Sequence, residues 1–183
     1  MFHVTERLLL RPAWPEDAEA LFGGIADRGV VRNLASAPWP YSVEHARKFV
    51  GTAPNPRLPN FLVTLPGAHG SRIIGGAGLG ACEDGVEIGY WIARPYWGQG
   101  FATEAARGVV EIARLLGHAH VHGGHFADNP ASGRVLRKLG FSPTGRCAMR
   151  HSCGRGEEAE CVMYRLDLTE GAEAGSQPGL QAA

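Results

Sequence analysis

Several short stretches of the chain are rich in apolar residues, often alternating with polar ones, and this pattern predicts β-strands. The first covers residues 5–11 and is ended by Pro12. Three more follow at 61–65, 72–80 and 86–92, with a turn at 67–70 and the hairpin pair Asp84-Gly85 between them. We therefore expect an antiparallel meander in the middle of the chain.

In four other stretches apolar residues recur every three or four positions, which predicts amphipathic helices. The first follows Pro15 and the second follows Ser42, a good N-cap residue. The longest covers residues 100–116. The last begins at Asn129, another N-cap residue, and ends at Gly140.

Further strands are predicted at 118–126, 141–150 and 160–168. The resulting order is strand, two helices, three strands, helix, strand, helix, two strands, which makes the chain an α/β (α+β) protein with about seven strands. We expect one domain over residues 1–168 and a flexible C-terminal tail over 169–183, where the residues are small and polar.

Composition adds little chemistry but excludes some classes of partner. Eighteen basic residues balance eighteen acidic ones among 183 residues, so no global field favours nucleic acid or a membrane surface. The first residues lack the basic-then-apolar order of a signal peptide, and no apolar run approaches the roughly 20 residues of a membrane span. We expect a cytoplasmic protein whose four cysteines are reduced thiols.

Three histidines in the predicted strand at 118–126 are candidate metal ligands. His118, His120 and His122 alternate, so a strand would place them on one face. Because no carboxylate or cysteine stands at a suitable spacing, solvent-facing histidines are the better interpretation and no metal is expected.

A glycine-rich turn lies where the strand at 86–92 gives way to the long helix. Gly98 and Gly100 carry no side chain that would block an anion, and the start of a helix adds partial positive charge. Two glycines before a helix are also typical of a plain tight turn. The segment is neither a dinucleotide-binding fingerprint nor a Walker A loop, because it lacks the third glycine and the Gly-Lys-Ser/Thr sequence.

A second motif changes this interpretation. Residues 129–141 carry an Asn-x-x-Ser…Lys-x-Gly-Phe pattern, and residues 97–105 read Trp-Gly-x-Gly-x-Ala-Thr-Glu-Ala. Together with the stretches 5–11 and 87–92, they resemble the GCN5-related N-acetyltransferases (GNAT), in particular the RimJ/RimL-like branch, over residues 3–168. The superfamily often has Arg or Gln where this chain has Trp97, which we interpret as a packing residue.

The resemblance implies a GNAT fold, with a mixed, mostly antiparallel, twisted sheet, helices on both faces and a splay between the fourth and fifth strands. It also implies acetyl-CoA as cosubstrate. The backbone of Ile92, Ala93 and Arg94 would pair with the pantetheine arm as an added strand would. Asn129 would contact the pantetheine, although it can equally be a plain helix cap. The backbone expected to hold the pyrophosphate is that of Gly98, Gln99, Gly100, Phe101, Ala102 and Thr103.

Two residues are candidates for catalysis by the same resemblance. Ser132 would donate a hydrogen bond to the departing CoA thiolate, unless it only bonds its own backbone. Glu87 would act as the base, directly or through a water, unless it is a surface carboxylate. Tyr90 and Tyr164 are weaker candidates for the acid and are also typical packed sheet aromatics.

The implied activity is N-acetyl transfer from acetyl-CoA to an amine, directly within a ternary complex. The acceptor can be a protein N-terminal α-amine. The alternatives are a small-molecule amine (a polyamine, an amino acid or an aminoglycoside) or a non-catalytic CoA-binding module. A homodimer, common among such proteins, is one compatible assembly, whereas neither nucleic acid nor membrane is expected as a partner.

Overall fold

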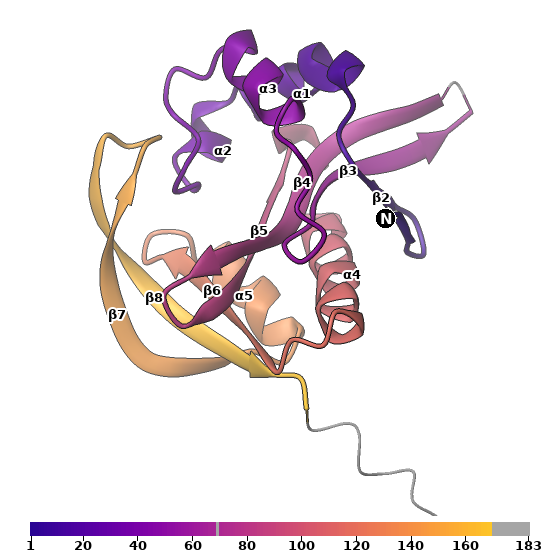
Figure 1. Cartoon of the computed structure of the whole chain (residues 1–183). Coiled ribbons are helices and arrows are strands. Elements are labelled where there is room, and N and C mark those ends of the chain that lie inside the picture. Colours follow the sequence, from indigo (N-terminus) through magenta and orange to yellow (C-terminus); the bar gives the residue numbers. More distant parts are fainter. Residues whose placement is uncertain (69, 170–183) are drawn as a thin grey trace, which may run out of the picture.

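The computed structural model describes residues 1–68 and 70–169, which form one eight-stranded sheet with helices on both faces (Figure 1). The strands lie in the order β1-β2-β3-β4-β5-β6-β8-β7, and only β5 and β6 are parallel. Their bounds are β1 His3–Val4, β2 Leu9–Arg11, β3 Asn60–Gly67, β4 Gly70–Cys82, β5 Gly85–Ile92, β6 His120–Phe126, β7 Ser142–Ser152 and β8 Glu157–Asp167. The predicted elements follow one another in the predicted order, but strand β1 and helix α2 are additional, so the sheet has eight strands rather than about seven. From residue 170 on, the predicted tail lies outside the described part.

The helices are α1 Ala18–Ile25, α2 Arg28–Val31, α3 Val43–Val50, α4 Phe101–Leu115 and α5 Pro130–Lys138, with single 3-10 turns η1 Pro15–Asp17 and η2 Arg94–Tyr96. Two predicted N-caps are confirmed. The Ser42 hydroxyl accepts a hydrogen bond from the His45 N–H at 3.4 Å, and the Asn129 side chain accepts one from the Ser132 N–H at 3.4 Å.

Helix α2 was not predicted. It begins because the Asp27 carboxylate accepts hydrogen bonds from the N–H groups of Gly29 (2.6 Å) and Val30 (3.3 Å). One glycine and two β-branched valines in four residues give a weak helical signal, and the helix is too short for periodicity to be recognised.

The predicted first strand at 5–11 is wrong for its first half. Residues 5–8 form a turn between β1 and β2, in which the Leu8 N–H donates to the Thr5 hydroxyl at 3.1 Å and the Thr5 N–H donates to the Leu8 carbonyl at 2.9 Å. The hydroxyl of a threonine competes with strand pairing in this way, so the apolar run that suggested a strand contains a turn.

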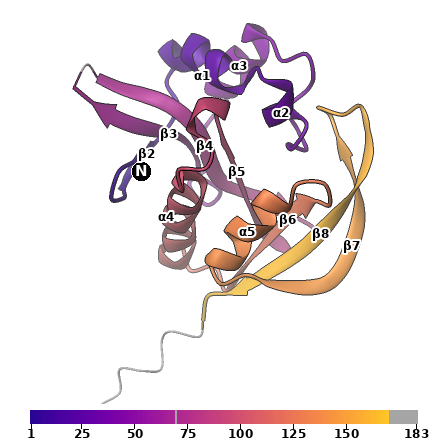
Figure 2. The same ribbon diagram turned by 180° about the vertical axis from the view of Figure 1, so that it is seen from behind.

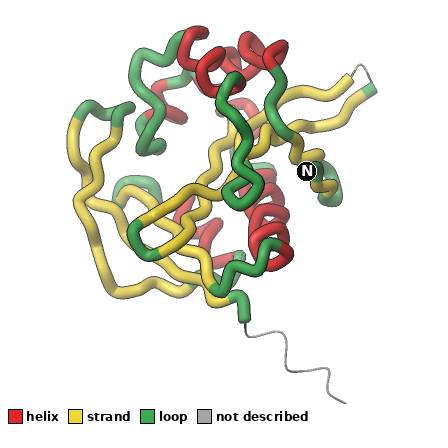
Figure 3. Tube along the Cα trace, viewed as in Figure 1, coloured by secondary structure: helices red, strands yellow, loops and turns green. Residues whose placement is uncertain are grey.

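The two faces of the sheet carry different helices. Seen from behind, α4 and α5 cover one face (Figure 2), whereas the three short helices of the first 50 residues lie together at one end of the other (Figure 3). The apolar side of α4 supplies the main core with fully buried residues, which are Ala105, Ala106, Val109, Ile112 and Ala113. The predicted amphipathic pattern of this helix is therefore confirmed.

The sheet opens between β5 and β6, the fourth and fifth of the predicted strands. Strand β5 pairs with β4 over its whole length, from Gly75↔Ile92 to Cys82↔Gly85. Between β5 and β6 the only paired residues are Glu87 and His122, so the second half of β5 has no partner on that side. The predicted splay is thus present, and it leaves backbone groups of β5 available.

No helix in the described ranges is long and apolar enough to cross a membrane.

Candidate active site

Strand alternation decides which backbone groups of β5 face the gap. The Ala93 N–H donates to the Ile74 carbonyl of β4 at 2.8 Å, and the Ala93 carbonyl accepts from the Tyr96 N–H at 2.9 Å. Because successive residues of a strand direct their N–H and C=O groups to opposite sides, the polar groups of Ile92 turn toward β6. The predicted pantetheine contact at Ala93 is therefore not available, and Ile92 and Arg94 are left as the candidates.

Trp97 lies at the mouth of this gap and does more than pack. Its indole Nε1 donates to the Ile92 carbonyl at 2.6 Å, and a Cβ on Gly29 of α2 would lie 3.6 Å from its ring. Nearby, Arg94 reaches Asp27 with 3.5 Å between Nη1 and Oδ2. The tryptophan thus connects the end of β5 with α2 and satisfies a carbonyl that no strand reaches.

The turn that follows carries a row of open main-chain donors. Gly98 and Gly100 have φ angles of +76° and +83°, which glycine adopts without steric cost. The backbone N–H groups of residues 98–103 donate no hydrogen bond to any other described residue, and the first paired donor of α4 is Glu104 N–H, bonded to the Gly100 carbonyl at 3.1 Å. Such a row at a helix N-terminus binds anions without cationic side chains.

Glu104 fixes this turn to the N-terminal hairpin. One of its carboxylate oxygens accepts from the Thr5 hydroxyl at 2.6 Å and from the Arg7 N–H at 2.7 Å, and the other binds the Arg7 guanidinium. Arg7 also donates to the Gln99 carbonyl at 3.2 Å and stacks over the Phe101 ring. Burial alone would raise the pKa of Glu104, but these hydrogen bonds outweigh it and lower the pKa.

On the other side of the gap, α5 presents Ser132 beside Tyr90 of β5. The Ser132 hydroxyl lies 2.9 Å from the Tyr90 hydroxyl, which is also 3.1 Å from the Ser132 carbonyl. Burial raises the pKa of Tyr90 from its ordinary value of about 10 to about 12. Two of the predicted candidates thus form one hydrogen-bonded pair, and Asn129 holds the helix end that carries Ser132.

Glu87 stands at the apex of the gap, where β5 and β6 make their single pairing. Its carboxylate is 2.7 and 2.9 Å from Nη1 of Arg150 on β7, and Gly124 of β6 leaves room for it, since a Cβ there would lie 3.2 Å from the Glu87 carboxylate. The carboxylate is therefore an ion-paired group rather than a free surface charge.

Tyr164 and the histidines have other surroundings. The Tyr164 hydroxyl accepts a hydrogen bond from Arg137 of α5 at 2.8 Å, so its partner on that helix is Arg137 and not Ser132. Nε2 of His122 is buried without a hydrogen-bond partner in the described structure, so this half-buried histidine faces solvent only in part. Among the residues that the structure describes, no group of three or more His, Cys, Asp or Glu side chains could hold a metal ion.

Comparison with known proteins identifies the family to which this fold belongs. Residues 7–142 match the family model of the acetyltransferase (GNAT) domain. The chain belongs to the GNAT acetyltransferase family. It is accordingly an acyltransferase of the acetyl-CoA-dependent kind, and the predicted enzyme class and cosubstrate are confirmed.

Individual relatives of this GNAT acetyltransferase support the assignment. The uncharacterised N-acetyltransferase YoaA of Bacillus subtilis (strain 168) is 31% identical over 155 residues, which cover 77% of this chain and 82% of YoaA. A GNAT-family acetyltransferase from Bacillus anthracis has a TM-score of 0.76 at 25% identity, covering 91% of this chain and 98% of that one.

RimL, the ribosomal L7/L12 alpha-N-protein acetyltransferase solved in complex with coenzyme A, has the same fold. Its TM-score is 0.72 at 22% identity, and the match covers 91% of this chain and 98% of RimL. The predicted GNAT fold is thus confirmed.

Sequence reasoning missed the polar partners of this GNAT site. Neither Arg150 nor the Thr5–Arg7–Glu104 contacts were predicted, because each joins residues more than 60 positions apart. The resemblance did supply one signal, since the motifs at 5–11 and 97–105 contain both ends of the Glu104 network.

Replacing Glu104 by Gln should lower the free energy of unfolding by about 2 kcal/mol at pH 7, because several charge-assisted hydrogen bonds are weakened together. The pKa of Glu104 is lowered by folding. Its contribution is therefore present above the unfolded pKa, about 4.3, and is lost as the pH falls through the lower folded pKa. Urea unfolding at several pH values measures both effects.

Glu111→Gln on the same helix is the matched control, since Glu111 is half exposed and, among the described residues, forms an ion pair only with His3. It should change stability by less than about 0.5 kcal/mol. Equal losses in the two variants would contradict the clamping role of Glu104.

Proposed function

We propose that this protein transfers the acetyl group of acetyl-CoA to an α-amine, with the donor in the gap between β5 and β6. The observation that carries the proposal is the row of unpaired N–H groups at residues 98–103, which lies directly beyond the end of β5. A diphosphate held by these donors would direct the pantetheine arm into the opened sheet. There the Ile92 backbone would pair with it.

The two sides of the gap would supply different parts of the chemistry. Ser132 and Tyr90 lie on the side of α5, whereas Glu87 and Arg150 lie at the apex. In the proposed step the neutral amine attacks the thioester carbon, and the C–N bond forms as the C–S bond breaks. Ser132 donates a hydrogen bond to the departing thiolate, and the proton of the amine passes to Glu87 or through water to solvent.

The cost of deprotonation favours an α-amine as the acceptor, because both oxygens of the Glu87 carboxylate already accept hydrogen bonds from Arg150. An α-amine, with a pKa near 8, requires only about 1.4 kcal/mol for deprotonation at pH 7, whereas a lysine ε-amine requires about 4.6 kcal/mol. RimL, which shares the fold, is named for α-N-acetylation of a ribosomal protein, and this supports the same class of acceptor.

Gly100→Glu should abolish detectable acetyl-CoA binding, because it places bulk and negative charge among the open N–H groups. Gly117→Glu is a matched control: Gly117 also has a positive φ, +77°, and open space around it, but it follows the C-terminus of α4. Isothermal titration with acetyl-CoA measures the difference. Unchanged affinity in Gly100→Glu would remove the proposed site.

Ser132→Ala should lower kcat about 100-fold while the Kd for acetyl-CoA stays within about twofold. Tyr90→Phe should cost less, about tenfold, because it removes only the hydroxyl that orients Ser132. The assay reads release of the CoA thiol, and Ser71→Ala, at an exposed position of β4, is the control. Full activity in Ser132→Ala would contradict its role at the thiolate.

A further inference from the structure

A cavity of about 560 Å³ lies between the α2 region and the turn that joins β7 to β8. One wall consists of Arg28, Gly29, Arg32 and Trp39, and the other of residues 153–157. Most of these residues are exposed, so the cavity opens to solvent. Three arginines line it against one acidic side chain, Glu157.

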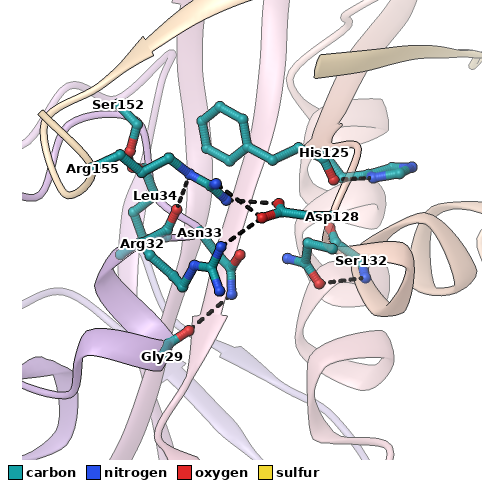
Figure 4. Close-up of polar contacts among 11 residues, drawn as sticks. Gly29, Arg32, Asn33, Leu34, His125, Asp128, Ser132, Ser152 and Arg155 are labelled. Carbon is teal, nitrogen blue, oxygen red and sulfur yellow. Dashed lines mark hydrogen bonds and ion pairs between the residues drawn. The ribbon is translucent and has the colours of Figure 1, made fainter. Parts of the chain in front are cut away.

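Arg155 ties the two walls together (Figure 4). Its guanidinium makes two hydrogen bonds to the Asp128 carboxylate, at 2.8 and 2.9 Å, and its Nε donates to the Arg32 carbonyl at 2.8 Å. It also stacks over the Phe126 ring, and its side chain is only 11% exposed. Most N–H groups of Arg155 therefore already donate to Asp128 and Arg32, so this arginine has a structural role and is not free to bind a ligand.

Asp128 places Arg155 beside the proposed reaction centre. It precedes Asn129, the cap of the helix that carries Ser132, and Figure 4 shows Asp128 between the two arginines and Ser132. A molecule that enters the cavity would thus approach the N-terminus of α5, where Ser132 lies.

The other two arginines keep donors available. The side chain of Arg28 makes no hydrogen bond or ion pair with any described residue, and the side chain of Arg32 uses one donor, Nη2, which bonds Asp128 at 2.6 Å. The two are four residues apart on and next to α2, which places their side chains on one face. A pair of guanidinium groups is the arrangement that recognises carboxylates with paired N–H donors.

We propose that Arg28 and Arg32 bind an acidic side chain close to the N-terminus of a peptide acceptor. This inference rests on the proposed function and names the class of its substrate. The opening of the cavity to solvent suits a chain that continues outward from the protein. Polyamines and aminoglycosides are cationic and would meet like charge at this wall.

The test compares peptides that begin with serine and carry Asp, Asn or Lys at the second, third or fourth position. The wild-type kcat/KM should be about tenfold higher for Asp than for Asn at one of these positions, as one charge-assisted contact predicts. Arg28→Gln, and Arg28→Gln with Arg32→Gln, should bring the ratio near one while the KM for acetyl-CoA stays within about twofold. The preference should also weaken at high salt.

Arg107→Gln is the matched control, because it removes the same charge from an exposed position of α4 away from the cavity. It should keep the preference for Asp. A wild-type enzyme that treats Asp and Asn peptides alike would overturn the inference, as would a preference that survives in both Arg28 variants. Free aspartate or glutamate as a better acceptor than any of the peptides would also overturn it.

Binding separates this inference from the proposed function. If no amine releases CoA thiol, the proposed function fails, and titration of the CoA-saturated protein with the same peptides still decides the inference. Binding of the Asp peptide about tenfold tighter than the Asn peptide, with the difference lost in Arg28→Gln, would support it. Equal binding of the two peptides would overturn it.

Discussion

The parting of β5 from β6 is the constraint from which the geometry of the site follows. A sheet normally satisfies the backbone of each inner strand on both sides, but here one residue pair, Glu87 and His122, holds the two strands together. Beyond it, Ile92 faces an opening, and Glu87 is fixed at its apex. The opening also separates Ser132 and Tyr90 on one side from the short N-terminal helices on the other. Each proposed role therefore depends on where the pairing stops.

Two anion sites of different construction would serve this arrangement. At residues 98–103 the donors are main-chain N–H groups, which carry no net charge and cannot move independently. At the cavity wall the donors are guanidinium groups on long side chains, partly held by Asp128. The main-chain site suits a ligand that a whole family shares. The guanidinium site can differ between relatives through single substitutions, so the choice of acceptor would be encoded there.

Much of the fold could be predicted from the sequence because its signals are local. The periodicity of α4, the caps at Ser42 and Asn129, and the glycine turn all act over a few residues. The predictions that were wrong or incomplete concern features that depend on individual hydrogen bonds rather than on periodicity. Residues 5–8 look like a strand until the Thr5 hydroxyl is seen to bond the chain three residues on, and α2 depends on one aspartate cap. Likewise the motif indicates the position of Ala93, whereas the direction of its backbone groups depends on the pairing with β4.

The indole of Trp97 has a consequence for how a ligand strand would gain its affinity. In the free protein the Ile92 carbonyl already accepts a hydrogen bond, so its desolvation is compensated before anything enters. The N–H of an incoming amide would either bond to the second lone pair of this oxygen or replace the Trp97 N–H as its donor. Either exchange changes the enthalpy at that atom very little. The net attraction for the carrier would then come mainly from its phosphates, and a shortened carrier without them would bind poorly however well its arm fitted the sheet.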